Sequence, residues 1–531
     1  MIRLCNANRE DLNIVNKIAV LFLAYKYSEF ESFVETENYI NKNINESTQE
    51  KLLQTLEKFH KAVDELSRIY RRKELVKALF ELECRRIEEH GEFQDLPDGV
   101  IELILALLDI KEGEKFLHVN AGTFKIPMHV ADNEKISVCG SCESQNSLYM
   151  GNIRSAVVDN RIEVKFGEIL ESELFDIQAD KVLVYPKYGR LNSSDIVNNE
   201  LNNFCERICC REWAYTLAGI LNQKRGGVTL AILPENVLVN EADKDIRKKL
   251  IESGKVAGII SLRKYDGLQR NLVIFTENNT CVKMFDAKDF FQNINDNDTE
   301  EILKQYNSGS ENCIEVSNDR IAANNYVIYP ARYLIETKID FEGENLSNFI
   351  KTIQRGAQQI NPQELNRIKS DVPTDYQFLN IQDITETGIN QNLTYLKEEA
   401  YSKYKNNFVS AGDIVISKIS PFKSAIIPDN NKKILISGNL YALKVADAVN
   451  PNWLLLCLKN SKIIMQLNAM ASGGVSKIIN PRNLNQIKIP KVSFDTQNEI
   501  AKKYTALIGE METLNLKAEE IRNKIKNLID V

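Results

Sequence analysis

The sequence predicts a multidomain α/β protein with four regions of different texture. Its 531 residues are three to four times the roughly 150 of a typical domain, so we expect two or three domains. Hydrophobic residues make up 43% and charged residues 27%, the balance of a globular chain. The apolar pattern changes along the chain, which predicts an N-terminal helical bundle, a doubly wound α/β domain, a mixed α+β domain and a long, coiled-coil-type C-terminal helix.

The first region, residues 1–90, is the expected helical bundle. Residues 10–90 contain no proline, and apolar residues such as Leu52, Leu56 and Phe59 recur every three or four positions. This is the spacing of amphipathic helices. The pattern leaves open whether the bundle binds a partner or has no binding role.

The second region, residues 91–285, is the expected doubly wound domain. Six runs rich in β-branched residues have the texture of buried parallel strands; they lie at 116–119, 135–140, 181–186, 228–234, 256–262 and 271–277. Helix-like stretches lie between them at 98–109, 199–222 and 241–253. Such alternation predicts an open sheet covered by helices.

Three further segments complete the chain. Residues 286–339 begin with a polar, Asn-rich stretch and are expected to be a connector, and residues 340–495 have the short, interrupted apolar runs of a mixed β-rich domain. In 496–531 apolar residues keep an unbroken 3-4-3-4 spacing, which predicts a heptad seam; its members are Tyr504, Leu507, Met511, Leu514, Ala518, Ile521, Ile525 and Leu528. A narrow seam favours packing against another long helix, and packing on its own chain is the alternative.

The charge distribution excludes a uniformly basic chain but not a basic face. The whole chain carries −7, whereas residues 371–490 contain 13 Lys and Arg against 9 Asp and Glu, a local charge of +4. A locally basic domain is what contact with phosphates needs. No run approaches the ~18 apolar residues of a membrane span, and the N-terminus lacks an apolar signal core. We therefore expect a cytoplasmic protein without membrane contact.

The ten cysteines are too sparse for a disulfide framework and fit a reducing compartment. Cys139 and Cys142 form a C-x-x-C pair, and Cys205, Cys209 and Cys210 cluster further on, so a zinc site is one interpretation. The helical spacing of the second cluster favours buried thiols instead. We predict no metal site.

The stretch G-E-F-Q-D-L-P-D-G-V-I-E-L-I-L-A-L-L-D-I-K-E-G-E-K-F-L-H-V-N-A-G-T-F at 91–124 resembles the opening of the methylase subunit of type I restriction-modification systems, an N6-adenine DNA methyltransferase family. The resemblance continues in order at 226–238, 245–262 and 321–334. It implies a Rossmann-like methyltransferase fold, S-adenosylmethionine as cofactor if the family function is retained, and a bacterial or archaeal source.

The cofactor loop departs from the family pattern D-P-A-C-G-[ST]-G-G. The matching stretch is H-V-N-A-G-T-F-K, in which His118 replaces the acidic residue, Gly122 and Thr123 are kept, and Phe124 and Lys125 stand at glycine positions. The glycines permit close approach of the backbone to the cofactor. Glu143 lies where a ribose-binding carboxylate is expected; a solvated loop glutamate is the alternative.

The catalytic loop departs further. The family pattern [DN]-P-P-[FYW] holds the flipped adenine through an amide or carboxylate and a stacked ring, and here it reads Tyr185, Pro186, Lys187 and Tyr188. A phenol does not reproduce the amide's acceptor geometry, and Lys187 adds a cation beside a sulfonium. We therefore expect a catalytically degenerate domain with no intact catalytic residue and no bound cofactor. The alternative is an active adenine-specific methyltransferase with altered loops. Arg190, with Lys187 and Tyr188, either touches DNA or belongs to an ordinary surface loop.

A second resemblance lies in the C-terminal part. Residues 376–389, 411–419, 436–445 and 472–490 are similar, in order, to one target-recognition domain of type I specificity subunits. The resemblance implies that this domain reads one half of a split DNA site and that the following helix is an antiparallel spacer. The chain would then be a fused half-complex of methylase and specificity subunit in a restriction-modification or other phage-defence system.

The expected partner is double-stranded DNA. Candidate phosphate contacts are Lys403, Lys405, Lys418, Lys423, Lys432, Lys433, Lys477 and Arg482, and polar residues in the same loops that could reach base edges are Ser417, Ser420, Asn439, Ser472 and Asn480. The seam would join a second copy of the chain or an intact methylase subunit, and a restriction subunit is a further candidate partner. A scaffold that binds only proteins is the competing class.

Overall fold

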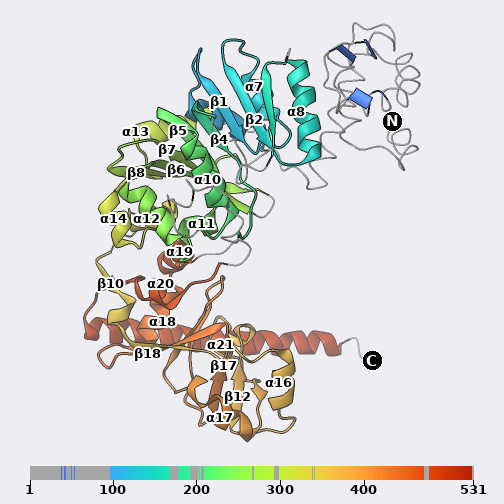
Figure 1. Ribbon diagram of the computed structural model, residues 1–531. Helices are drawn as coiled ribbons and strands as arrows, with labels where there is room; N and C mark the ends of the chain where they lie inside the picture. Colours follow the sequence, from blue (N-terminus) through green and yellow to red (C-terminus); the bar gives the residue numbers. More distant parts are fainter. Residues whose placement is uncertain are drawn as a thin grey trace. The chain divides into compact units, whose positions relative to one another are not determined.

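A computed structural model describes residues 96–528, apart from 159, 168–176, 192–200, 202–203, 205–207, 266–267, 292–297, 338, 340 and 472–476, and a few positions between 37 and 53. The chain divides into two compact units, Met1–Pro330 and Ala331–Val531 (Figure 1). The bundle expected at 1–90 falls almost wholly outside the described residues.

The first unit contains a mixed sheet of nine strands in the order β3-β2-β1-β4-β5-β7-β6-β8-β9. Their bounds are β1 Lys115–Val119, β2 Ser137–Cys142, β3 Ile162–Phe166, β4 Ala179–Val184, β5 Gln223–Pro234, β6 Val256–Tyr265, β7 Leu268–Phe275, β8 Cys281–Asp286 and β9 Cys313–Ser317. Strands β1 to β5 pair in parallel, whereas β7 runs antiparallel between β5 and β6. The predicted α/β class is confirmed, but the prediction that all six runs are parallel is wrong at β7.

The sheet extends beyond the boundary expected at 285. Strand β9 pairs with β8, and helices α13 (Thr299–Ser308) and α14 (Asn318–Ala323) also fall in the segment expected to be a connector. The run C-I-E-V-S of β9 is short and only partly buried. An edge strand of this kind carries little of the apolar signal that marks buried strands.

Helices pack on opposite faces of the sheet. The remaining helices of this unit are α6 Asp98–Leu108, α7 Lys125–Val130, α8 Gln145–Val157, α10 Arg211–Leu221, α11 Glu235–Val239 and α12 Lys244–Glu252. A Cβ on Gly219 of α10 would lie 2.4 Å from Val184 of β4, so α10 sits directly on the face to which Val184 points. Leu183 points the other way and joins Val100 and Ile104 of α6 in one buried cluster.

Phe124, at a family glycine position, keeps a glycine-like backbone but points into the core. Its φ is +60°, a conformation that side chains rarely adopt, and its ring is fully buried. Added Cβ atoms at Gly140 of β2 and Gly151 of α8 would lie 2.4 Å and 2.8 Å from ring atoms. The two glycines therefore make the space that the ring fills.

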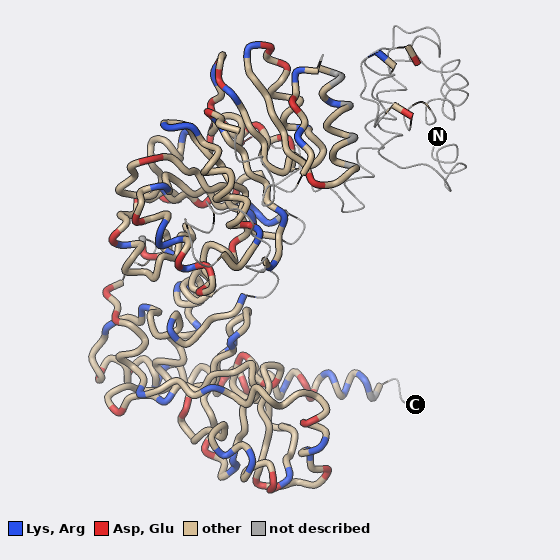
Figure 2. Tube along the Cα trace, in the orientation of Figure 1, with Lys and Arg blue, Asp and Glu red and all other residues tan. Residues whose placement is uncertain are grey.

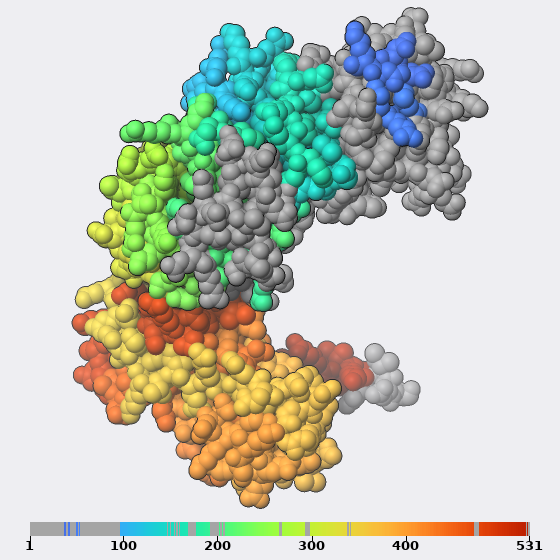
Figure 3. All heavy atoms as spheres, in the orientation of Figure 1, coloured from blue at the N-terminus to red at the C-terminus, as the bar shows by residue number. Residues whose placement is uncertain are grey.

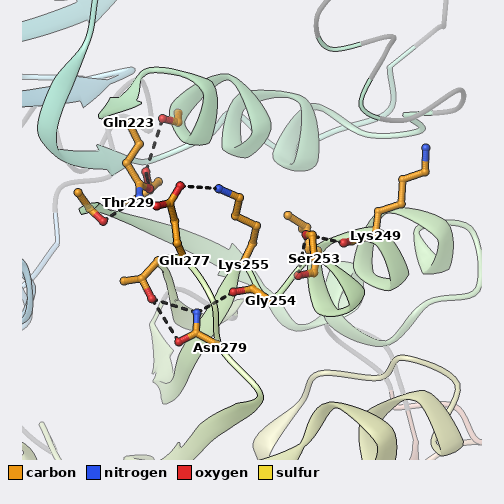
Figure 4. A network of polar contacts seen from close by, with 12 residues as sticks. Gln223, Thr229, Lys249, Ser253, Gly254, Lys255, Glu277 and Asn279 are labelled. Atoms are coloured by element: carbon orange, nitrogen blue, oxygen red, sulfur yellow. Dashed lines mark hydrogen bonds and ion pairs between the residues drawn. The ribbon is translucent and has the colours of Figure 1, made fainter. Parts of the chain in front are cut away.

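A network of polar contacts holds the turns at the amino end of β6 (Figure 4). Asn279 donates to the carbonyl of Gly254 over 2.9 Å, and Lys255 pairs with Glu277 over 3.2 Å. At the start of β5, Gln223 bonds to the carbonyl of Gly227 over 2.7 Å. These contacts fasten turns at the sheet edge opposite to the carboxyl ends of the parallel strands.

The second unit is a mixed α+β domain followed by a long helix. Its strands form a two-stranded sheet β10-β19 and two four-stranded sheets, β11-β18-β15-β16 and β13-β12-β17-β14. The bounds are β10 Gly343–Asn345, β11 Ile350–Arg355, β12 Tyr376–Leu379, β13 Thr394–Tyr395, β14 Phe408–Val409, β15 Ile414–Ser417, β16 Ser424–Ile426, β17 Lys433–Ile436, β18 Leu440–Val445 and β19 Lys488–Pro490. The helices are α15 Pro330–Thr337, α16 Pro362–Ile368, α17 Glu398–Tyr404, α18 Pro451–Lys459, α19 Ser461–Met470, α20 Pro481–Asn485 and α21 Phe494–Asn527.

Asparagine determines where most of these helices begin. Side chains of Asn361, Asn450, Asn460 and Asn480 each accept a backbone N–H in the first turn of the following helix, which is the preferred N-cap chemistry. The main core of the unit forms around Trp453 of α18, which is 2% exposed.

Helix α21 has 34 residues, or about 50 Å at 1.5 Å per residue. Its first turns pack against α18, and its outer end stands clear of the rest of the unit (Figure 3). The predicted long C-terminal helix is confirmed. Tyr504, expected to open an intermolecular seam, instead lies partly buried against the core of its own unit.

Candidate functional site

The carboxyl ends of β1, β2 and β4 meet at one edge of the first sheet. The loop after β1 is bonded to both neighbours: Asn120 Nδ2 donates to the carbonyl of Tyr185 over 2.7 Å, and Asn120 N donates to Ser141 Oγ over 3.0 Å. Ser147 of α8 donates to the carbonyl of Gly122. In open α/β sheets, ligands bind at this edge, and the sequence candidates Gly122, Glu143 and Lys187 all fall there.

Glu143, one residue beyond β2, is held from two directions. Lys187 Nζ lies 2.6 Å from Glu143 Oε2, and the hydroxyl of Tyr215 in α10 donates to Glu143 Oε1. The Glu143 side chain is only 10% exposed, against 47% for Lys187. The alternative of a solvated loop glutamate is therefore wrong.

His118 and Thr123 lie beneath this edge. His118, in β1, is 3% exposed, and burial lowers the pKa of its imidazole from 6.5 to about 3. Neither ring nitrogen has a hydrogen-bond partner among the described residues, so a neutral, isolated imidazole stands at the family's acidic position. Thr123 Oγ1 accepts a long 3.4 Å bond from Arg154 of α8.

The loop after β4 carries Tyr185, Pro186, Lys187 and Tyr188, the stretch compared above with the family's catalytic pattern. Pro186 is buried, while Tyr185 and Tyr188 are half-buried. Burial raises the pKa of the Tyr188 hydroxyl, so this phenol stays neutral. The loop continues into Gly189, whose N–H donates to Glu212 Oε2 of α10 over 3.2 Å. The motif is thus packed against α10.

Comparison with known proteins identifies the class of this domain. The order of β1 to β7, with β7 reversed, resembles a Rossmann-like methyltransferase fold. Residues 85–341 match the N-6 DNA Methylase family, so this part of the chain is an N6-adenine DNA methylase family domain. No match was found among curated proteins.

Several solved structures are similar. One is the methyltransferase subunit of a type I restriction-modification system from Streptococcus thermophilus, at 16% identity over 60% of this chain and 92% of that chain, TM-score 0.46. The type IIG restriction endonuclease BpuSI matches at 13% identity over 92% of this chain and 72% of that one, TM-score 0.49. A DrdV–DNA complex matches at 11% identity over 92% and 66%, TM-score 0.47.

The side chains at the carboxyl edge do not fit S-adenosylmethionine, the cofactor that this family implies. Glu143, the carboxylate available for a ribose, already accepts from Lys187 and Tyr215. The Lys187 ammonium would also add a positive charge to a site that has to accept a sulfonium cation. Phe124 is not an obstacle, although it stands at a glycine position of the family pattern, because its ring lies in the core.

The eight basic candidates of the second unit divide by environment. Lys418 is 6% exposed, with its ammonium over the Tyr441 ring, so it is not available to a phosphate. Lys403 and Lys432 pair with Glu364 and Asp375. The other five are exposed or half-buried. Lys423 donates to the carbonyl of Ile384 and Lys477 to that of Asn468, while Lys433 lies over the Tyr376 and Tyr401 rings. Lys405 and Arg482 are exposed on the surface.

The polar loop residues named as base readers lie on the same unit. Ser417 is fully buried and bonds to the carbonyls of Ile419 and Pro421, so it does not face DNA. Ser420 bonds to Asn468, and Asn480 caps α20. Asn439 is exposed, and Ser472 lies outside the described residues.

Most seam residues beyond Tyr504 lie on an exposed face of α21. Leu507, Leu514 and Ile521 are 63%, 64% and 56% exposed, and Ile525 and Leu528 are exposed to a similar degree. Met511 and Ala518 are half-buried. Lys and Arg residues follow one another toward the outer end of the same helix (Figure 2).

The cysteines that the structure describes do not gather at one site. Cys139 and Cys142 are three residues apart in β2 and so point to opposite faces of the strand. Cys205 lies outside the described residues. Within the described part of the chain, no group of three or more His, Cys, Asp or Glu residues is arranged to hold a metal ion, and no helix there combines the length and apolarity needed to cross a membrane.

Proposed function

We propose that this protein binds duplex DNA through residues 340–495 and carries a catalytically inactive methyltransferase domain, as part of a restriction-modification or related phage-defence system. The observation that carries the proposal is the pairing of Lys187 with Glu143 over 2.6 Å. It puts a cation from the degenerate catalytic motif onto the carboxylate of the cofactor edge.

The charge of the second unit supports DNA binding. Residues 371–490 carry +4 in a chain of −7, and seven of the eight candidate side chains, all but Lys418, are not buried. Release of counterions by such contacts makes DNA affinity fall steeply with salt.

Gel shifts test the proposal with random and selected duplexes between ~50 and ~200 mM salt. We expect the double variant Lys405→Ala with Arg482→Ala to bind several-fold more weakly on all sequences. Lys351→Ala is the matched control, because Lys351 is exposed in the same unit but paired with Asp447 over 2.5 Å. Absence of binding at ~50 mM salt would leave the protein-only scaffold as the function.

The seam is proposed to bring a second reader to the DNA. One recognition domain contacts few base pairs, whereas specificity on a genome needs more. A second copy, or an intact methylase chain, packed on Leu507 to Leu528 would supply it. Light scattering is expected to show a reversible dimer that Leu514→Lys with Ile521→Lys dissociates, because like charges would be buried. Leu516→Lys is the control, since Leu516 is 64% exposed but lies off the seam.

The family match of residues 85–341 favours one other candidate, an active adenine methyltransferase. Transfer of a labelled methyl group to duplex DNA separates the two. We expect none above background; catalytic transfer would establish the active enzyme.

A further inference from the structure

The Lys187–Glu143 ion pair joins the loop after β4 to the loop after β2. In the sheet β1 lies between β2 and β4, and strands separated by one neighbour are about 10 Å apart. Lys187 follows β4 and Glu143 follows β2, and their charged atoms meet at 2.6 Å. The ion pair therefore links the loops that follow the two strands flanking β1.

Glu143 is also satisfied from the helix side. Tyr215, a fully buried residue of α10, donates its hydroxyl to Oε1 while Lys187 takes Oε2. One carboxylate thus joins the loop after β2 to the loop after β4 and to α10. A ribose diol would have to compete with the Lys187 ammonium and the Tyr215 hydroxyl, because both carboxylate oxygens already accept charge-assisted hydrogen bonds.

The two residues that stand at glycine positions of the family pattern, Phe124 and Lys125, point away from Glu143. Phe124 turns into the core between Gly140 and Gly151, and Lys125 turns to Asp98, 2.7 Å away. Neither crosses the edge. Asn120 is bonded to the Tyr185 carbonyl, which keeps the loop after β4 near β1 but adds no charge.

We propose that Lys187 is an internal substitute for the cofactor: its ammonium occupies the Glu143 carboxylate, excludes S-adenosylmethionine and fastens the loops after β2 and β4. This rests on the proposed function in one respect, that the methyltransferase domain is inactive, and it assigns the inactivity to one residue. The carboxylate that would recognise a nucleoside ribose is retained but occupied by the chain itself.

Isothermal titration of the full chain with S-adenosylmethionine and, separately, the neutral S-adenosylhomocysteine tests the proposal. For the wild type we expect no saturable binding of either ligand below about 1 mM. For Lys187→Ala we expect both ligands to bind, with affinity raised at least about tenfold. Adding Glu143→Gln to Lys187→Ala should abolish the gain.

Lys224→Ala is the matched control. Lys224 pairs with Asp180 over 2.8 Å at similar exposure, 44%, but at the amino end of β4, so its loss should leave the titration unchanged. Circular dichroism melting confirms that each variant is folded. The proposal is overturned if either ligand binds the wild type below about 1 mM, or if neither ligand binds the Lys187→Ala variant. Gel shifts on the same variants report the DNA function independently, because Lys187 lies outside residues 340–495.

Discussion

His118 should make the first unit sensitive to mild acid. Its imidazole is neutral in the folded protein because burial lowers its pKa to about 3, whereas the ordinary value is 6.5. Between these two values the unfolded chain binds a proton that the folded chain does not. The free energy of unfolding must therefore fall as the pH drops below about 6.5, with a limiting slope of about 1.4 kcal/mol per pH unit.

The magnitude follows from the two pKa values. At pH 7 the unfolded histidine is mostly neutral and the penalty is small; at pH 5 it is almost fully protonated, so His118 alone removes about 2 kcal/mol of stability. This is a large part of the 5–15 kcal/mol typical of a domain. Carboxylates contribute to the total slope, so the histidine is isolated by substitution.

His118→Leu removes the titrating group with little change in volume and deletes two nitrogens that lack partners among the described residues. Urea denaturation at pH 7 and pH 5, followed by tryptophan fluorescence, should show the pH 7 to pH 5 loss reduced by about 2 kcal/mol in this variant. His129→Leu is the control, because His129 is exposed on α7 of the same unit. Equal losses in wild type and His118→Leu would show that the imidazole does not stay neutral in the folded state.

Three further substitutions test the packing. Gly140→Ala places a Cβ 2.4 Å from the Phe124 ring, so urea denaturation should show a free energy of unfolding lower by about 1–3 kcal/mol. Unchanged stability would contradict the described ring position. Arg247 donates to three backbone carbonyls over 2.6–2.9 Å, and Arg247→Met leaves these carbonyls without that donor. Calorimetry should show about 3 kcal/mol of destabilisation, and a rise in melting temperature would contradict a stabilising role of these hydrogen bonds. Trp453→Ala empties the core of the second unit, with an expected loss of about 3–5 kcal/mol in chemical denaturation, whereas a loss under about 1 kcal/mol would refute its central place.

The sequence located the strands of the first sheet where they are buried. Runs such as V-T-L-A-I-L-P in β5 and N-L-V-I-F in β7 are apolar on both faces, which is a strong signal. The same composition does not encode direction, so the reversal of β7 was missed. Strand β3, with the alternating run I-E-V-K-F, was missed because an edge strand carries half of the signal.

The candidate site was predicted residue by residue but not as an arrangement. Glu143 and Lys187 were both singled out, yet their pairing joins positions 44 residues apart and follows only from the strand order. The direction of Phe124 had a readable signal in Gly140 and Gly151, which flank its ring, but glycines in a strand and a helix have many other causes. The burial of Lys418 could not be read from a basic residue in a polar loop.

The packing of Phe124 between two glycines couples the sequence of this loop to the core beneath it. Restoring glycine at 124 would suit the backbone, whose φ is +60°, but would empty a ring-sized volume at a cost of about 3–5 kcal/mol. Adding alanine first at Gly140 or Gly151 would collide with the ring that is still present. The cost of a substitution at one of the three positions therefore depends on the residues at the other two. The residue at position 124 is therefore constrained by the packing of the core, independently of any ligand at the edge above it.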